Sequence, residues 1–260
     1  RRPVQTSLSK RLSAILKNEP ARTRKLEKKA IGLVDRIWVC SELDRQRLME
    51  LHRPASTIHV VPNGIPGSVS LHRDVPKVIS RGGDGPVILF VGHLGYWPNV
   101  KAAERLATGI LPLVHKHFPS ALVVLAGRSP AASVLSLAAR PGIELHADPP
   151  DLSGLYERAD IAAVPLSEGG GTRIKILEAM ASGLPVVATA IAVEGLDLAD
   201  GEEVLMAETD EGIARHIVEL FRNPEAMRRQ CRYARKTVQL RYGSVALDLA
   251  VGEGLGFGSY

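Results

Sequence analysis

The amino-acid sequence predicts an α/β fold, in which a doubly wound parallel sheet carries helices on both faces. From residue 87 onward, short apolar runs rich in Val, Ile, Leu and Ala recur, and most of them end in Gly, Pro or Ser. Strands that are buried on both faces have this composition. Segments with a helical spacing of apolar residues separate the runs, and such alternation of strand and helix builds a parallel sheet.

The first 86 residues predict a smaller α/β segment followed by a linker. The expected elements are a helix over 7–31 that Pro20 interrupts, a strand over 36–40, a helix over 42–51 and a strand over 58–61. Ser41 is placed to cap the second of these helices. The turn signal Pro62-Asn-Gly64 then opens a stretch up to residue 86 with many Pro, Gly, Ser and Asp residues and little periodicity, which is typical of a linker.

The main sheet is expected to follow this linker. Its predicted strands are 87–91, 121–126, 143–146, 161–164 and 185–188, and a short apolar run covers 204–206. The predicted helices are 100–118, 133–140, 151–159, 173–182, 210–222 and 224–242, with Asn99 as a cap, a break near Pro112 and Pro224 in a first turn. Parallel sheets bind ligands at the carboxyl ends of their strands. The loops of interest are therefore 92–99, 127–130, 146–151 and 167–172.

Composition narrows the functional classes. The chain has 260 residues, of which only 4% are aromatic, which disfavours a stacking platform for single-stranded nucleic acid. Its two cysteines, Cys40 and Cys231, lie far apart and lack the paired spacing of a zinc site or a disulfide framework. No apolar run approaches the roughly 20 residues that span a bilayer, and no secretory signal opens the chain. These features predict a cytoplasmic protein.

The segment from Arg1 to Ala30 is strongly basic and contains only Glu19 and Glu27 as acidic residues. Its basic residues are Arg1, Arg2, Lys10, Arg11, Lys17, Arg22, Arg24, Lys25, Lys28 and Lys29. One interpretation is a solvated helix face. Another is peripheral contact with anionic lipid head groups, which would make the protein membrane-associated, or with an acidic acceptor. A nucleic-acid partner is not expected, because no base-reading motif accompanies the charge.

The most informative segment is Pro165-Leu-Ser-Glu-Gly-Gly-Gly-Thr-Arg-Ile-Lys-Ile-Leu-Glu-Ala-Met-Ala-Ser-Gly183. The glycines that end the strand let backbone amides approach a ligand, and Thr172 can cap the helix that follows. The free amides and dipole of a helix start favour a diphosphate. Arg173 and Lys175 lie in the first turn, where a cation is mildly unfavourable, so their position indicates a bound anion.

Glu178 lies one turn after Lys175, in an otherwise apolar stretch. Directed into the crevice, its carboxylate could accept hydrogen bonds from both hydroxyls of a ribose. The alternative is a surface pair between Lys175 and Glu178, worth a few tenths of a kcal/mol. Helical spacing by itself leaves both interpretations open.

This segment resembles the donor loop of the retaining GT-B glycosyltransferases of group 1, also called glycosyltransferase family four. Further blocks agree with that family in order, over roughly residues 30 to 242. They are Val34-Asp-Arg-Ile-Trp-Val-Cys-Ser41, Val60-Val-Pro-Asn-Gly64, Leu89-Phe-Val-Gly-His-Leu-Gly-Tyr-Trp-Pro-Asn99, Val124-Leu-Ala-Gly127, Pro150-Asp-Leu-Ser-Gly-Leu-Tyr156 and Gly183-Leu-Pro-Val-Val-Ala188. Each block alone would be weak evidence, but their common order is specific.

The resemblance implies roles for particular residues. The glutamate that holds the nucleotide ribose in the family corresponds to Glu178. A second family glutamate, eight residues earlier, is replaced by Gly170, and Glu168 is a candidate substitute. The family arginine after the first strand's glycine is His93 here, which could instead bond a backbone carbonyl. Arg173 and Lys175 are then the candidates for the charge against the leaving diphosphate.

Other residues are expected at the rim of the same site. By resemblance, the donor contacts Gly92, His93, Gly127, Arg128, Asp151, Leu152, Glu168, Gly169, Gly170, Gly171, Thr172 and Glu178. The donor is a nucleotide sugar such as a UDP- or GDP-sugar, and the acceptor is a carbohydrate or a lipid-linked molecule. The resemblance implies retention of anomeric configuration with neither metal ion nor cofactor, and the scattered histidines indeed lack metal-ligand spacing.

The resemblance also implies a domain organisation. Residues 1–61 would be the C-terminal remnant of the acceptor-side domain, 62–86 the linker, 87–242 the Rossmann-like nucleotide-sugar-binding domain and 243–260 a tail without fixed structure, since glycine recurs at every second position near its end. On this view the chain binds a donor but transfers sugar poorly. The alternatives are a nucleotide-sugar epimerase or an inactive nucleotide-binding module of the same fold.

Overall fold

The computed structural model describes residues 19–65, 85–170 and 174–256. The chain divides into two compact units, one formed by Arg1–Val61 with Ala250–Tyr260 and the other by Pro62–Leu249. Each unit is described by itself below. Of the predicted site residues, Gly171, Thr172 and Arg173 lie outside the described ranges, as does the part of the basic segment before residue 19.

The smaller unit contains a parallel two-stranded sheet. A helix over 19–31 precedes β1 (Arg36–Val39), α2 (Glu42–His52) and β2 (Thr57–Val60), and β1 pairs with β2 with Ile37 opposite Ile58. The predicted cap of α2 is confirmed, because the Ser41 hydroxyl accepts a hydrogen bond of 3.1 Å from the amide of Asp44. Capping satisfies one of the backbone donors that a helix start leaves unpaired.

The prediction of a tail without structure is wrong for most of its length. Helix α11 runs from Ser244 to Leu255. Within the smaller unit, the carbonyl of Gly254 accepts hydrogen bonds from Arg36 Nη1 at 2.9 Å and from Trp38 Nε1 at 3.4 Å. A Cβ at Gly254 would lie 2.8 Å from Trp38 Nε1. Glycine is a poor helix former, but here it permits a close contact whose packing outweighs the local propensity.

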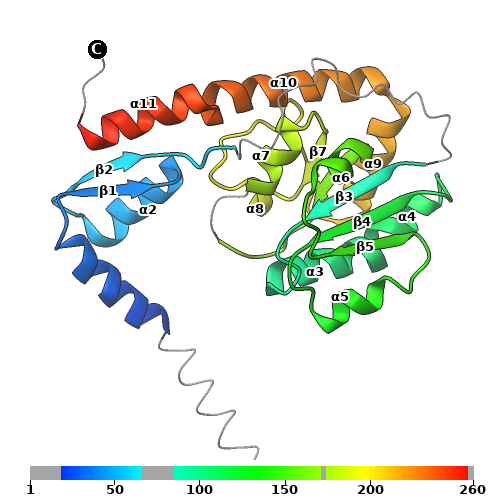
Figure 1. The fold of residues 1–260 in the computed structure, drawn as a ribbon, viewed down its shortest axis with the longest axis horizontal. Coiled ribbons are helices and arrows are strands. Elements are labelled where there is room, and N and C mark those ends of the chain that lie inside the picture. The colour runs from blue at the N-terminus through cyan, green and yellow to red at the C-terminus, as the bar shows by residue number, and fades with distance from the viewer. Residues whose placement is uncertain (1–18, 66–84, 171–173, 257–260) are drawn as a thin grey trace, which may run out of the picture. The chain divides into compact units, whose positions relative to one another are not determined.

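The larger unit has the predicted α/β architecture, with six parallel strands in the order β5-β4-β3-β6-β7-β8. The strands are β3 (Val87–Val91), β4 (Leu122–Gly127), β5 (Ile143–Ala147), β6 (Ile161–Val164), β7 (Val186–Ala188) and β8 (Leu205–Met206). The helices are α3 (Trp97–Arg105), the π-helical segment η1 (Leu106–Ile110), α4 (Leu111–His115), α5 (Ala132–Leu137), α6 (Ser153–Arg158), α7 (Ile174–Ala181), α8 (Ala190–Val193), α9 (Asp210–Arg222) and α10 (Pro224–Tyr242). Figure 1 shows α3 and α5 on one side of the sheet and α6 and α7 on the other.

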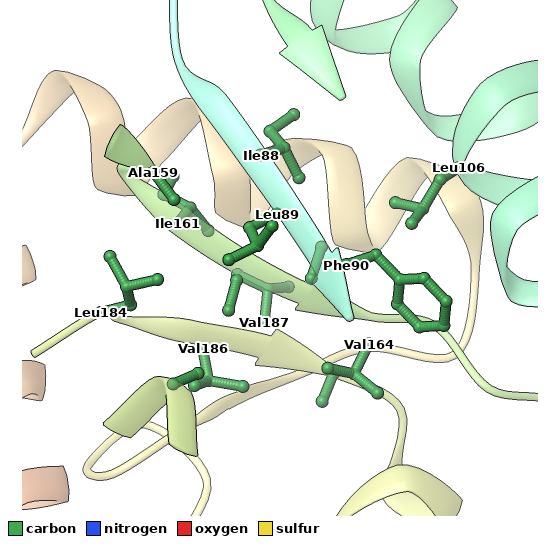
Figure 2. Packing of buried hydrophobic residues seen from close by; sticks show 14 of the residues in the cluster. Ile88, Leu89, Phe90, Leu106, Ala159, Ile161, Val164, Leu184, Val186 and Val187 are labelled. Carbon is green, nitrogen blue, oxygen red and sulfur yellow. The ribbon is translucent and has the colours of Figure 1, made fainter. Parts of the chain in front are cut away.

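The core of the larger unit lies along its central strands. Ile88, Leu89 and Phe90 of β3 are almost completely buried, as are Ile161 of β6 and Val187 of β7. Figure 2 shows the apolar side chains of these three strands packed beside one another. Strands buried on both faces need such continuous apolar runs, which is why they could be predicted from the sequence.

The strand order creates a switch point beside β3. From β3 the chain builds β4 and β5 on one side, then returns to place β6, β7 and β8 on the other. The connections that leave β3 and β6 therefore run to opposite faces, and the carboxyl ends of these two strands border the crevice in which open α/β sheets bind ligands.

Two details of the first crossover differ from the prediction. Asn99 does not cap a helix, because α3 already begins at Trp97 and the Asn99 side chain is buried. The helix also continues past Pro112 instead of breaking there, since the π-helical turn η1 directly precedes α4. A proline removes one backbone donor and displaces the carbonyl four residues earlier, and a π-helical turn accommodates this change within a continuous helix.

Candidate functional site

The carboxyl ends of β3 and β4 approach each other so closely that side chains are excluded. Gly127 ends β4 with φ of +146°, and a Cβ there would lie 1.7 Å from the carbonyl oxygen of Gly92. The amide of Gly92 donates to the carbonyl of Ala126 at 3.0 Å. Glycine is required at position 127 both by its φ and by this close approach. Two predicted site residues, Gly92 and Gly127, are thus neighbours at the crevice.

Lys175 joins the two sides of the switch point. It lies in the first turn of α7, after β6, and its Nζ donates to Asn99 Oδ1 at 2.6 Å, after β3. The same Nζ lies 4.5 Å from the centre of the Phe90 ring, and a Cβ on Gly92 would lie 2.8 Å from it. The ammonium is therefore placed at the end of β3, beside the loop in which the family resemblance implies an arginine and this chain has His93.

Asn99 holds this arrangement from the other side. Its side chain is 7% exposed. Its Nδ2 donates to the carbonyl of His93 at 3.0 Å, and its Oδ1 accepts the hydrogen bond from Lys175 Nζ. His93 itself is exposed. Sequence reasoning assigned Asn99 to a helix cap and missed this role, although the residue closes one of the blocks shared with the family.

Glu178 bonds a residue of a different helix. The hydroxyl of Tyr156 on α6 donates to Glu178 Oε2 at 3.0 Å. Burial, and then the Glu178 charge, raise the pKa of Tyr156 well above its ordinary value, so the phenol stays protonated and acts as a donor. Lys175 and Glu178 thus each bond a residue of another crossover.

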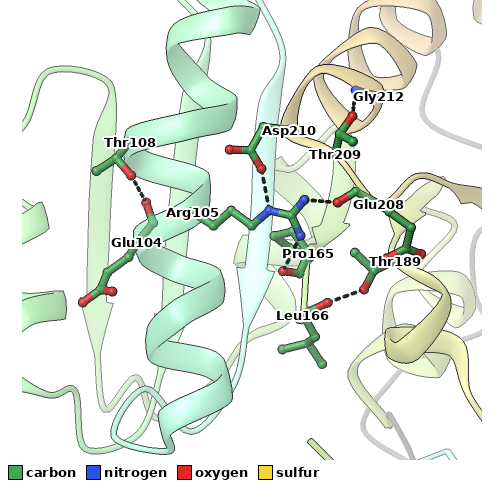
Figure 3. Close-up of polar contacts among 10 residues, drawn as sticks. All are labelled: Glu104, Arg105, Thr108, Pro165, Leu166, Thr189, Glu208, Thr209, Asp210 and Gly212. Carbon is green, nitrogen blue, oxygen red and sulfur yellow. Dashed lines mark hydrogen bonds and ion pairs between the residues drawn. The ribbon is translucent and has the colours of Figure 1, made fainter. Parts of the chain in front are cut away.

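Two side chains hold the start of the glycine loop by its backbone. Arg105 Nη1 donates to the carbonyl of Pro165 at 3.2 Å, and the Thr189 hydroxyl donates to the carbonyl of Leu166 at 2.6 Å. Arg105 also bonds Asp210 and the carbonyl of Glu208, both at 2.5 Å (Figure 3). These contacts tie the end of β6 to the segments that follow β7 and β8. The sequence indicated neither Arg105 nor Thr189, because their partners are distant along the chain.

The described part of the glycine loop has little side-chain bulk around it. Gly169 has φ of +122°, a backbone conformation that favours glycine. A Cβ added at Gly170 would contact nothing within 4 Å, and Glu168 is exposed. The structure gives no contact that joins Glu168 to the other predicted site residues, so its role as a substitute glutamate stays a prediction.

The remaining predicted residues lie on the rim, beyond β4 and β5. Arg128 is exposed. Asp151 accepts bonds from the amide of Ser153 and from its hydroxyl, and the hydroxyl bond is the main reason why the pKa of Asp151 is lowered. Leu152 immediately precedes α6 and is half-buried. Within the described residues, no hydrogen bond or ion pair links Arg128 or Asp151 to the Glu178 carboxylate.

Among the described residues, no group of three or more His, Cys, Asp or Glu side chains is arranged to hold a metal ion. Within the same residues, none of the helices combines the length and the apolar character needed to cross a bilayer.

Known proteins match both the sequence and the fold. The phosphatidyl-myo-inositol mannosyltransferase of Propionibacterium freudenreichii is 32% identical over 129 residues, which cover 50% of this chain and 32% of that protein. The D-inositol 3-phosphate glycosyltransferase of Mycolicibacterium smegmatis is 32% identical over 197 residues, 67% of this chain and 42% of that protein. The chain thus spans less than half the length of either relative.

A solved structure confirms the fold. The structure of Anabaena HepE in complex with UDP and glucose superimposes with a TM-score of 0.70 at 15% identity, covering 90% of this chain and 67% of that one. The family described as glycosyl transferases group 1 matches residues 85–223, more than half of the chain. This range contains the glycine pair at the ends of β3 and β4, Lys175 and Glu178. The chain belongs to the group 1 glycosyl transferases.

Proposed function

We propose that this chain supplies the donor side of an enzyme that transfers a sugar from a nucleotide diphosphate to an acceptor, with retention of anomeric configuration and without a metal ion or cofactor. The observation that carries the proposal is the geometry of α7. This helix starts at the switch point, sends Lys175 across to the end of β3, and carries Glu178 one turn further along. A cation and a carboxylate at this spacing match a diphosphate linked to a ribose.

The proposed chemistry depends on charge stabilisation. The bond between the anomeric carbon and the diphosphate oxygen breaks, and the diphosphate leaves with the electron pair. The acceptor hydroxyl oxygen bonds the anomeric carbon and loses its proton to an oxygen of the departing diphosphate. Lys175 and Arg173 would stabilise the negative charge on the departing group together with the amides at the start of α7. Because Asn99 and Phe90 already place the Lys175 ammonium, little reorganisation would be needed during the reaction.

The donor is proposed to be a UDP- or GDP-sugar. The HepE structure contains UDP and glucose. The similarity of its fold to that of this chain supports the proposal of a nucleotide-sugar donor. The two enzymes named above act, by their names, on inositol-containing molecules. By analogy we propose a carbohydrate or lipid-linked acceptor.

A peripheral membrane contact is part of the proposal. The described portion of the basic segment is a helix whose residues 19–30 are all exposed, including Arg22, Arg24, Lys25, Lys28 and Lys29. Such a helix attracts an anionic surface by about 1 kcal/mol per basic residue close to it. The protein would thus act in the cytoplasm at the membrane surface. Sedimentation with vesicles that contain phosphatidylglycerol, compared with neutral vesicles, tests this part independently of the sugar chemistry.

Calorimetry with UDP, GDP and their glucose and mannose derivatives tests the donor site. We expect one nucleotide to bind, and Glu178→Ala to weaken its binding by about 1–3 kcal/mol because a charged acceptor of the ribose hydroxyls is lost. Glu219→Ala, which changes an exposed glutamate of α9, is the control and should leave affinity unchanged. The ribose assignment is wrong if Glu178→Ala binds as well as the unmodified chain.

A further inference from the structure

A side-chain hydrogen bond between Tyr156 and Glu178 connects two helices of the larger unit. Tyr156 is 6% exposed and comes from α6, in the crossover between β5 and β6, whereas Glu178 comes from α7, in the next crossover. The two residues are 22 positions apart in the sequence, and the 3.0 Å bond between them joins their helices. The carboxylate would otherwise be free to rotate about its side-chain torsions, since Glu178 is only half-buried.

The chemistry of the pair leaves one carboxylate oxygen unused. A phenol has a single proton to donate, and Tyr156 donates it to Glu178 Oε2. Of the residues that the structure describes, only Tyr156 hydrogen-bonds the Glu178 carboxylate. A carboxylate has room for about four donors, and no described side chain donates to Oε1. The bond at Oε2 restricts the plane in which Oε1 can lie.

We infer that Tyr156 is a positioning residue that orients the Glu178 carboxylate toward a ribose and thereby makes the site prefer ribonucleotides over 2′-deoxyribonucleotides. This inference rests on the proposed function, because it presupposes that Glu178 receives the ribose hydroxyls. A carboxylate held in one orientation distinguishes a sugar with two adjacent hydroxyls from one with a single hydroxyl better than a rotating carboxylate does, because the loss of a partner cannot be compensated by reorientation. The raised pKa of Tyr156 supports the role, since the donor then stays protonated across the neutral and mildly alkaline range.

The alternative is that the bond only satisfies a buried hydroxyl. Buried polar groups need partners, and the loss of the bond would then reduce stability but not the selectivity between sugars. Tyr242 provides a matched comparison within the same unit. It is also 6% exposed, and its hydroxyl donates to the backbone carbonyl of Leu196 at 2.8 Å instead of to a carboxylate.

The experiment measures a selectivity ratio on the full 260-residue chain. Calorimetry gives the dissociation constants of UDP and dUDP, or of GDP and dGDP if the guanine nucleotide binds, and the ratio of deoxy to ribo form is the readout. The proteins are the unmodified chain, Tyr156→Phe, Tyr242→Phe and Glu178→Ala. Thermal unfolding of each protein confirms that it is folded at the temperature of the titration.

We expect the unmodified chain to bind the ribonucleotide about tenfold or more tightly than its 2′-deoxy form. Tyr156→Phe should lower this ratio by about threefold or more, chiefly by weakening the ribonucleotide, whereas Tyr242→Phe should leave it unchanged even if both variants lose similar stability. Glu178→Ala should reduce the ratio to near one.

Two failures can be told apart. A ratio that Tyr156→Phe leaves unchanged, while Glu178→Ala abolishes it, overturns the positioning role and leaves the ribose assignment intact. A ratio that Glu178→Ala leaves unchanged, or an unmodified chain that binds both sugars equally, overturns the ribose assignment of the proposed function as well. A fall of equal size in Tyr156→Phe and Tyr242→Phe also overturns the inference, because it would reflect loosened packing in general.

Discussion

Single glycines of the larger unit meet very different surroundings. A Cβ at Gly127 would collide with the Gly92 carbonyl, and the residue has a positive φ as well. A Cβ at Gly92 would meet the ends of the Lys175 and Asn99 side chains at 2.8 and 2.9 Å. At Gly170 it would meet nothing within 4 Å. The three positions look alike in sequence, but only at Gly127 does the backbone itself exclude a side chain.

The first prediction compares two of these glycines. We expect Gly127→Ala to lower the free energy of unfolding by at least about 2 kcal/mol, since it adds both backbone strain and a clash with a carbonyl that cannot move away. Gly170→Ala should stay within about 0.5 kcal/mol of the unmodified chain. Urea unfolding followed by circular dichroism measures both. Equal stability of the two variants would contradict the close approach of β3 and β4.

Glu144 provides a pH-dependent contribution. Arg158 donates to both of its carboxylate oxygens, at 2.6 and 2.7 Å, and His146 Nε2 lies 2.5 Å from one of them. The hydrogen bond from Arg158 is the main cause of a pKa below the ordinary value of 4.5 for Glu144, and His146 adds to it. A carboxyl whose pKa is lowered by folding stabilises the folded state above its unfolded pKa and loses this contribution as the pH falls through the folded value.

The second prediction is that the stabilising contribution of Glu144 disappears at low pH. Glu144→Gln should be less stable than the unmodified chain by about 1 kcal/mol or less at pH 7, because the pair is partly exposed and screened by solvent. The difference between the two proteins should persist down to about pH 4.5 and shrink below it, as the carboxyl takes up a proton. Urea unfolding at a series of pH values provides the measurement. A difference that grows toward low pH would contradict the assignment.

Among the elements, two long helices of the larger unit are capped by side chains at their starts. The Thr209 hydroxyl caps α9 by accepting from the amide of Gly212 at 3.1 Å. Asn223 caps α10 through the amide of Ala226 at 3.0 Å, with Pro224 in the first turn as predicted. At Gly109 in η1, a Cβ would lie 2.0 Å from Asp210 Oδ2. The glycine therefore allows the start of α9 to approach η1 closely.

The third prediction concerns the cap of α9. Thr209→Ala should cost about 1 kcal/mol of stability, because the amide of Gly212 loses its side-chain partner. Thr108→Ala is the matched control. The Thr108 hydroxyl bonds the Glu104 carbonyl one turn earlier in an exposed part of its helix, and alanine is the better helix former there. Denaturant unfolding should therefore show a clear loss for the first variant and little change for the second.

Across the larger unit, one polar junction connects the ends of three strands. Arg105 bonds the backbone after β6 and after β8 as well as the Asp210 carboxylate at the start of α9 (Figure 3). The Thr189 hydroxyl, after β7, bonds the carbonyl of Leu166. Because these contacts end where the glycine loop begins, they determine the direction in which that loop leaves the sheet.

The fourth prediction tests the junction. Arg105→Met keeps the apolar stem but removes its hydrogen bonds, and we expect a loss of about 2–3 kcal/mol because partly buried carbonyl and carboxylate oxygens lose a charged donor. Arg215→Met removes an exposed arginine of α9 that lies 4.0 Å from Glu219, and it should change stability by less than about 0.5 kcal/mol. Hydrogen exchange of the amides of 166–170 should accelerate only in Arg105→Met. Unchanged exchange there would show that the loop does not depend on the junction.

The regular parts of the fold were accessible from sequence because their signal is local. The runs that became β3 and β6 were predicted at their observed bounds, Val87–Val91 and Ile161–Val164, and so were α9 and α10. Continuous apolar runs, helical spacing and the Pro224 start each depend on neighbouring residues only. The short helix α8 gave no such signal, and α11 formed despite its glycines because Gly254 packs against Trp38.

The candidate site divides in the same way. The chain of amino acids alone indicated a glycine loop, Lys175 and Glu178, because residue type and helical spacing suggest charge and ribose recognition. The sequence could not indicate that Asn99 accepts a hydrogen bond from Lys175 or that Tyr156 donates one to Glu178. The two residues of each pair come from different crossovers, which only the folded sheet brings together. Local patterns set which elements form and which residues carry charge. The parallel packing of β3 beside β6 decides which of these residues meet, because contact between distant segments is a property of the folded sheet.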